Sequence, residues 1–337
     1  DFGCDVNLCY AFDGGFGGRV MHVLLIALIA MAAPAALAQE AYQPPRTAEG
    51  HPDFSGTWGA SFMTLLERPP FLKTLVLTAD EARSAVDILT KGTPDLIDPD
   101  FFIQNINTVA QVRGEYRSSL LVLPADGQMP YTEKGIKLAD RFDWMDTQGD
   151  DNPEERTTFD RCLAGLGQPP IRQIPAMVPN TFLQTPREIV ILTEDTGSLR
   201  VIHTDGAAPP PPAVTSYEGW SAGRWEGDTL VVETTRIRAD DPFRGGFGRP
   251  ILIEPDSKVT ERFTRVSPTE LHYQFTVEDS DLYTAPWLAE YSFKLQDTTF
   301  YEYACHEANY SLTNILLGGR EGDKRDAAKA KKPVKRK

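Results

Sequence analysis

From about residue 180 onward, apolar and polar residues alternate with a period of two. Side chains at i and i+2 lie on the same face of a strand, so this period predicts β-structure. In residues 270–279 (ELHYQFTVED), for example, one face carries Leu271, Tyr273, Phe275 and Val277. We expect strands at 181–185, 188–194, 198–205, 221–225, 229–235, 258–266, 270–279, 288–295 and 300–305.

The links between these strands are short and rich in turn residues, such as Asp195-Thr196-Gly197 and Ser267-Pro268-Thr269. Hairpin links of this kind predict an antiparallel meander, which closes into a barrel or folds into a sandwich. The fold class is therefore mainly β, with a small N-terminal α/irregular segment. Two longer connections, 209–212 and 239–250, interrupt the meander, and long loops at a barrel rim commonly carry specificity.

The stretch GWSAGRWEGDTLVVETT (219–235) holds two carboxylates, Glu226 and Asp228, that could be read as a catalytic pair. Gly227 between them marks a tight turn, where both side chains splay into water. We therefore interpret the pair as the end of a hairpin. Trp220, Arg224 and Trp225 on the incoming strand are better candidates for ligand contact, because arginine and indole together suit an anionic aromatic molecule.

One helix is predicted in residues 77–92 (LTADEARSAVDILTKG). Thr78 and Glu81 form a capping box, and Gly92 is a suitable C-terminal stop. The residues expected on its buried face are Ala82, Ala85, Val86 and Leu89. This helix belongs to a segment, 39–160, that we expect to pack on a barrel domain formed by residues 161–319.

Residues 21–38 (MHVLLIALIAMAAPAALA) resemble a secretory signal that ends in the A-x-A site Ala36-Leu37-Ala38. A membrane anchor is the competing reading, but the apolar run is shorter than the ~20 residues a span needs. Residues 1–20 are interpreted as a non-native leader and are left out of the fold prediction. The expected location is periplasmic or secreted.

The formal net charge is −14, yet residues 320–337 carry nine Lys/Arg against three Asp/Glu. This basic tail is predicted to be disordered. The remaining chain is strongly acidic, which argues against nucleic acid as a partner because phosphate binding needs a basic face.

The predicted export decides which redox state we expect for the cysteines. Cys162 and Cys305 are the two cysteines that follow the signal, and an oxidising compartment favours a disulfide between them. Inert buried thiols and a reactive or metal-binding thiol are the alternatives. Zinc would need three or four converging ligands, and no second His/Cys cluster has suitable spacing, so no metal or cofactor is predicted.

An apolar, tyrosine-rich face is predicted to continue across three successive strands. Its tyrosines are Tyr273, Tyr291, Tyr301 and Tyr303. The face is either a packed core or a barrel lumen that holds a hydrophobic or aromatic ligand, with the hydroxyls as its few polar groups.

The densest group of chemically active residues is ACHEANY (304–310). His306 could act as general acid or base, with Glu307 or Glu302 orienting it. Neighbouring strand residues point to opposite faces, so Cys305 and His306 should not form a thiolate–imidazole pair.

Several long motifs together resemble a family of uncharacterised exported bacterial proteins. They are Arg161-Cys162, WEGDTLVVET, ERF and YEYACHE. The resemblance implies a bacterial, exported protein and supports the pairing of Cys162 with Cys305, but it implies no activity. A weaker likeness to lipocalin-type barrels rests on Gly56-Thr57-Trp58 and the strand pattern.

The sequence thus favours an exported protein that binds a small hydrophobic or aromatic molecule in a β-barrel. One alternative is a lyase, isomerase or hydrolase that uses His306. Another is a structural or interaction protein with a filled core.

Overall fold

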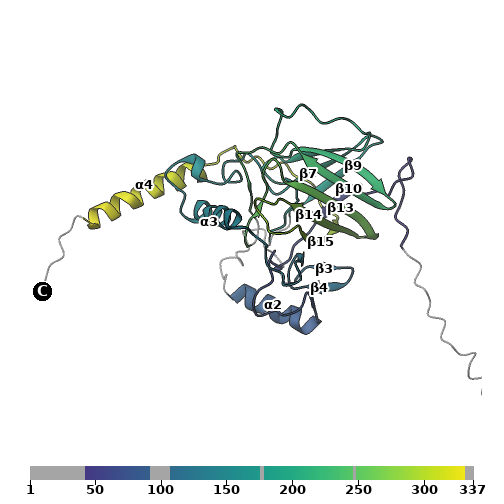
Figure 1. Ribbon diagram of the computed structural model, residues 1–337, viewed down its shortest axis with the longest axis horizontal. Coiled ribbons are helices and arrows are strands. Elements are labelled where there is room, and N and C mark those ends of the chain that lie inside the picture. The colour runs from purple at the N-terminus through teal and green to yellow at the C-terminus, as the bar shows by residue number, and fades with distance from the viewer. Residues whose placement is uncertain (1–41, 92–106, 175–177, 246–247, 331–337) are drawn as a thin grey trace, which may run out of the picture. The chain divides into compact units, whose positions relative to one another are not determined.

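The computed structural model describes residues 42–91, 107–174, 178–245 and 248–330 (Figure 1). The chain divides into two compact units, residues 1–42 and 43–337, and the description below concerns the second. The predicted leader, the signal at 21–38 and Gly92 lie outside the described residues.

Nine strands close into a β-barrel, which decides between the two architectures that the sequence allows. In the order of pairing around the barrel they are β1 (Gly56–Gly59), β6 (Asn180–Gln184), β7 (Glu188–Thr193), β8 (Leu199–His203), β9 (Trp220–Glu226), β10 (Thr229–Thr235), β13 (Lys258–Ser267), β14 (Glu270–Glu278) and β15 (Trp287–Gln296). β15 pairs back onto β1 and closes the ring. All of these pairs are antiparallel except β8–β9, because the long connection 204–219 carries the chain back before β9 begins.

Smaller elements lie against the barrel. β5 (Leu121–Leu123) pairs with β15, while β2 (Val76–Leu77), β4 (Glu115–Arg117) and β3 (Gln111–Val112) form a separate sheet. β11 (Phe243–Arg244) pairs with β12 (Ile251–Leu252). The helices are α2 (Ala79–Lys91), α3 (Glu133–Thr147) and α4 (Ser311–Ala330), with a 3₁₀ turn at Pro153–Glu155. α2 packs beside β2 and β4 (Figure 1).

The predicted helix and its capping box are confirmed. Thr78 N donates to Glu81 Oε2 at 2.8 Å, and Glu81 N donates to Thr78 Oγ1 at 3.3 Å. Ala82, Ala85 and Val86 are buried against the small sheet. Leu89 is half-buried.

Two predictions about secondary structure are wrong, and one helix was not predicted. The strand expected at 300–305 is wrong: this segment is irregular, and the sheet is complete without it because β15 pairs with β1. The tail expected to be disordered from 320 is helical as far as Ala330. α3 has no counterpart in the predictions, although Thr132 caps it by accepting from Gly135 N at 3.1 Å.

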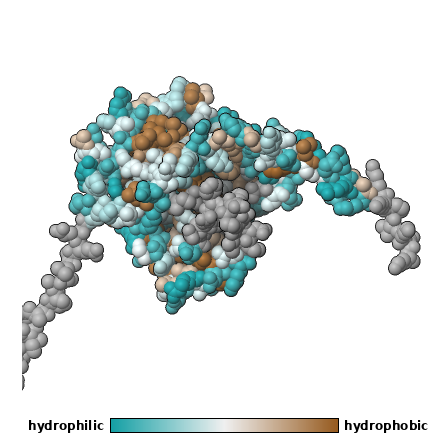
Figure 2. All heavy atoms as spheres, turned by 180° about the vertical axis from the view of Figure 1, so that it is seen from behind, coloured by the Kyte–Doolittle hydropathy of each residue, from teal (hydrophilic) through white to brown (hydrophobic). Residues whose placement is uncertain are grey.

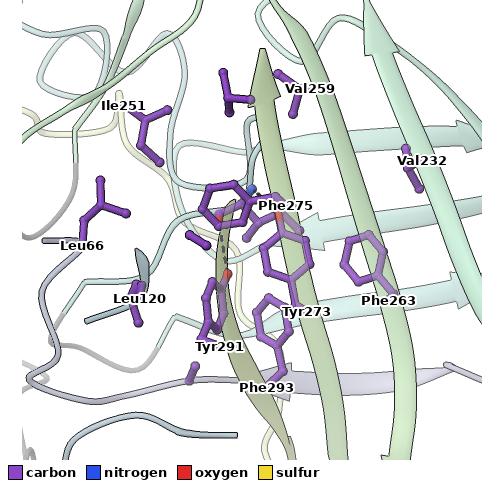
Figure 3. Packing of buried hydrophobic residues seen from close by; sticks show 14 of the residues in the cluster. Leu66, Leu120, Val232, Ile251, Val259, Phe263, Tyr273, Phe275, Tyr291 and Phe293 are labelled. Carbon is purple, nitrogen blue, oxygen red and sulfur yellow. Dashed lines mark hydrogen bonds between the residues drawn. The ribbon is translucent and has the colours of Figure 1, made fainter. Parts of the chain in front are cut away.

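Large side chains fill the barrel interior. The rings of Phe263, Tyr273 and Phe293 lie side by side, with centroids 4.8 and 5.6 Å from that of Tyr273 (Figure 3). Trp58 is fully buried, donates to Phe54 O at 2.8 Å and lies under the guanidinium of Arg265. The tyrosine-rich face is therefore a packed core over β14 and β15.

A charged pair is enclosed in the same interior. Arg200 and Glu261 form an ion pair, and their side chains are 2% and 0% exposed. Arg200 also donates to Ser221 Oγ and to Thr234 Oγ1, each at 2.9 Å, while Tyr273 donates to Glu261 at 2.6 Å. Hydrogen bonds to neighbouring strands thus offset part of the cost of burying two charges.

Candidate functional site

A hollow with a volume of about 680 Å³ lies beside the barrel. Three stretches of chain form its walls: α3, residues 153–174 and residues 239–254. A volume of this size falls within the range of small-molecule sites, roughly 300–1,000 Å³. Described residues of the predicted specificity loop 239–250 line it, but none of the described lining residues belongs to the ring of barrel strands.

Apolar and aromatic side chains supply part of this wall. Phe142 on α3 and Phe243 on β11 pack with ring centroids 5.6 Å apart. Leu138, Phe159 and Leu166 add further apolar surface. The hollow can therefore accept the hydrophobic body of a ligand.

Most of the carboxylates that line the hollow are paired with cations. The ion pairs are Asp143–Arg249, Asp160–Arg156, Asp240–Arg238, Asp241–Arg244 and Glu254–Lys134. Glu154, which is exposed, is the remaining acid among the described lining residues.

Three arginines in the wall form no ion pair with any described carboxylate. They are Arg141, which is exposed, Arg161, which is half-buried, and Arg172, which is buried. With the other acids paired, these three guanidiniums and Glu154 are the charged groups of the described lining that form no ion pair with a described residue. An arginine fork suits a carboxylate, sulfonate or phosphate group.

Arg172 is the most enclosed of the three, with 8% of its surface exposed. Its guanidinium donates to neutral oxygens: Gly245 O at 2.6 Å, Gln168 Oε1 at 3.3 Å, and Gly165 O. Its Nε donates to no acceptor among the described residues. Burial lowers the pKa of Arg172 to about 9, and the nearby charge of Arg244 adds to that effect.

The wall of the hollow is tied to the barrel core through one residue. Tyr273 in β14 accepts from Ile171 N at 2.9 Å, and Tyr291 in β15 donates to Ile171 O at 2.9 Å. Ile171 is itself fully buried. Two of the tyrosines predicted to contact a ligand therefore position the segment that carries Arg172.

The other predicted ligand residues are dispersed. Arg224 and Trp225 are consecutive in β9 and point to opposite faces. Arg224 is exposed and pairs with Glu226 and Glu233, whereas Trp225 stacks on His51 with ring centroids 4.8 Å apart. Trp220 stacks on His203 at 3.8 Å. None of the three lies among the described residues that line the hollow.

The hairpin interpretation of Glu226 and Asp228 is confirmed. Glu226 pairs with Thr229 across a two-residue loop, and Gly227 has a φ of 60°. Asp228 forms an ion pair with Arg46 at 2.7 Å, and Glu226 binds Arg224 and Arg262. Both carboxylates therefore hold neighbouring chain segments.

The residues of the predicted acid/base site lie on the irregular segment after β15. His306, Glu302 and Glu307 are exposed, and none is among the described residues that line the hollow. Tyr301 and Tyr303 are 64% and 47% exposed. A catalytic role for His306 thus stays a prediction that this geometry does not strengthen.

The disulfide between Cys162 and Cys305 is confirmed, with Cα atoms 5.7 Å apart. It joins the segment that carries Arg161 to the segment that carries His306. Asn309 Nδ2 also lies 3.2 Å from Cys162 Sγ.

Over the described ranges, no three His, Cys, Asp or Glu side chains are grouped so that they could hold a metal ion. Among the described helices, none has the length and apolar character that crossing a membrane requires. On the face drawn in Figure 2, hydrophobic residues form small groups separated by hydrophilic ones.

Comparison of the chain with protein-family models, with curated proteins and with solved structures finds no match in any of the three. The resemblance to an exported bacterial family therefore remains a prediction, and the site is argued from its own chemistry.

The sequence analysis singled out Arg161 only as part of a motif and did not select Arg172. Both lie in the stretch 157–174, whose turns and prolines give no period that would assign faces. The two arginines line the same hollow, and the hydrogen bonds of Ile171 that hold this stretch to the barrel span 102 and 120 residues.

Proposed function

We propose that this protein binds a small organic anion with an apolar or aromatic body in the hollow beside the barrel. The observation that carries the proposal is the 680 Å³ hollow with three arginines that lack a carboxylate partner among the described residues. The sequence also predicted a hydrophobic or aromatic ligand, but in the barrel lumen. We place the ligand in the hollow beside the barrel instead.

The filled interior supports this relocation. A ligand in the lumen would have to displace Phe263, Tyr273 and Phe293, which are fully buried. Removing large aromatic side chains from a core costs about 3–5 kcal/mol each, so the lumen is an unfavourable site. The hollow needs no such displacement.

The arginines differ in burial, which suggests distinct roles. Arg161 and Arg141 can approach the anionic group from the solvent side, while Arg172 presents a desolvated charge at the wall. A charge-assisted hydrogen bond to one of them contributes about 1.5–3 kcal/mol. The apolar wall around Phe142 and Phe243 would cover the body of the ligand.

Export is the second part of the proposal. A disulfide is typical of proteins outside the cytoplasm, and Cys162–Cys305 supports the periplasmic or secreted location predicted from residues 21–38. The protein would then bind its ligand outside the cytoplasm.

The test uses two fluorescent probes that share one aromatic body. 8-Anilino-1-naphthalenesulfonate carries a sulfonate, and N-phenyl-1-naphthylamine lacks it. We expect saturable one-to-one binding of the sulfonate and a loss of about tenfold in its affinity for Arg161→Gln, which corresponds to ~1.4 kcal/mol. The affinity of the uncharged probe should change less than about twofold.

The matched control is Arg83→Gln, since Arg83 lies exposed on α2 and does not line the hollow. It should leave both affinities unchanged. Equal losses for the two probes, or no loss of the sulfonate's affinity with Arg161→Gln, would contradict an anion site here.

A further inference from the structure

The outer wall of the barrel carries an aliphatic patch on three neighbouring strands, β6, β7 and β8. Phe182, Ile191 and Ile202 of these strands are buried in the interior, so their neighbours in sequence point outward. The patch consists of Leu183, Val190, Leu192, Leu199 and Val201. Leu183 is 49% exposed and Leu199 is 53% exposed. The patch is therefore open to a partner.

The register of the strands makes these side chains contiguous. Leu183 pairs with Val190, which pairs in turn with Val201, and Leu192 pairs with Leu199. Residues paired directly across antiparallel strands have Cβ atoms about 4.5–5.5 Å apart. The five side chains thus form two adjoining rows.

The other outward faces of the same barrel are polar. Across β9, β10 and β13, Arg224 and Arg262 both pair with Glu226. The outward face of β15 carries Glu290, which is paired with Arg117 of β4. An open aliphatic face is therefore an exception in this barrel.

β7 has the composition of a strand that is covered on both sides. Its inward residues Ile189 and Ile191 alternate with Val190 and Leu192, which gives an uninterrupted apolar run. Such runs are typical of strands buried on both faces, whereas a strand with one wet face alternates between apolar and polar residues. The composition of β7 thus predicts that its outer face is covered when the protein functions.

We propose that a second copy of this chain covers the aliphatic patch, with the two β6–β8 faces packed against each other about a two-fold axis. Such an axis lets one patch serve both copies, so no second complementary surface is needed.

The charge of the chain supports a second copy as the occupant. Each copy carries a formal charge of −14, so two copies approach with least repulsion where their surfaces are uncharged. Among the outward-facing residues of these three strands, only Glu188 and His203 are ionisable, and they pair with each other at 3.2 Å. The same negative charge disfavours an anionic membrane as the occupant.

The size of the patch predicts a weak dimer. Three strands ~4.8 Å apart, with five residues each at a rise of ~3.3 Å, give a face of roughly 14 by 17 Å. Even with its rim, this face is smaller than the ~800 Å² per partner of a standard interface. The association should therefore be reversible, with a dissociation constant above about 1 μM.

Dimerisation and the proposed ligand site are independent of each other. None of the five patch residues is among the described residues that line the hollow. Failure of one proposal therefore leaves the other intact.

Sedimentation velocity of the unmodified protein, from about 5 to about 500 μM, tests the dimer. We expect a mass that rises with concentration from one chain toward two. Salt screens the repulsion between acidic copies, so the dimer should be stronger in about 500 mM than in about 50 mM sodium chloride. An interface held by ion pairs would show the opposite dependence.

Leu199→Lys should weaken the dimer by about tenfold or more, because the two-fold axis places two buried charges in the contact. Leu123→Lys is the matched control, since Leu123 is also 53% exposed but lies on β5, outside the patch. It should change the dissociation constant by less than about twofold. Circular dichroism should show that both variants are folded.

Three results would overturn the proposal. One is a mass of a single chain over the whole concentration range in both salts. Another is a dimer that Leu199→Lys and Leu123→Lys weaken equally. The third is a mass that continues to rise past two chains, because a two-fold contact closes at the dimer.

Discussion

The buried ion pair between Arg200 and Glu261 makes the sharpest prediction about stability. Glu261→Gln keeps the shape of the side chain and removes its charge. Arg200 then remains in the barrel interior, 2% exposed, without a counter-charge. Breaking a buried pair by removing one partner costs about 3–5 kcal/mol, and we expect a loss of that size in the free energy of unfolding.

The companion variant removes both charges. Arg200→Met combined with Glu261→Leu leaves no buried charge, and replacing a buried pair with apolar residues is often neutral or stabilising. Tyr273 loses its acceptor Glu261, at a cost of about 1–3 kcal/mol, whereas Ser221 and Thr234 keep their hydrogen bond to each other at 2.9 Å. The double variant should therefore be no less stable than Glu261→Gln alone.

Urea unfolding followed by tryptophan fluorescence measures both changes, and an unchanged m-value shows that the unfolded surface is the same. Asp205→Asn is the control, because its partner Arg187 is 78% exposed and its charge stays in contact with water when Asp205 is neutralised. That control should change stability little. A loss below about 1 kcal/mol for Glu261→Gln would refute the argument that an uncompensated charge is trapped inside the barrel.

Two further predictions concern acid and redox conditions. Burial alone would raise the pKa of Glu290, but hydrogen bonds from His272 and Arg117 outweigh it and hold that pKa at about 2. The charged form of Glu290 therefore stabilises the folded protein fully above the ordinary pKa of about 4.5, and this stabilisation is lost as the pH falls toward 2. It is at most about 3 kcal/mol, or roughly 2 kcal/mol after allowance for partial solvent access. Glu290→Gln should flatten the pH dependence of the unfolding free energy between pH 5 and 2 by that amount, and an unchanged slope would contradict the assignment. For the disulfide, Cys162 and Cys305 are 143 residues apart, so Cys162→Ser with Cys305→Ser should cost about 3–5 kcal/mol in urea unfolding. Mass spectrometry of the non-reduced protein should find neither thiol free, and detection of both as free thiols would remove the basis for this value.

The strands that the sequence predicts well are those with one buried and one polar face. In β14 the apolar set Leu271, Tyr273, Phe275 and Val277 is fully buried, as the period of two requires. Residues 300–305 carry the same alternation, yet they form no strand, and the preceding strand β15 already pairs with β1 and β14. Period alone gives a residue's face and cannot say whether a partner strand exists.

The candidate site was less accessible to prediction for a related reason. Arg161 and Arg172, which line the hollow, both lie in a turn-rich stretch without a period. Arginine is mostly exposed in proteins, so nothing in the local sequence marks either residue as buried. Their burial depends on contacts between distant segments, such as Ile171 with Tyr273 and Tyr291.

The contact of Ile171 with the two core tyrosines also links ligand affinity to barrel integrity. Tyr273 and Tyr291 bind the backbone of Ile171, one residue before Arg172, so any loosening of the core displaces a wall of the hollow. A screen that selects variants for altered ligand affinity would therefore return positions on β14 and β15 that never touch the ligand. Conversely, a tightly bound ligand would slow the exchange of amide protons deep in these two strands. Hydrogen exchange in the core would therefore report whether the hollow holds a ligand.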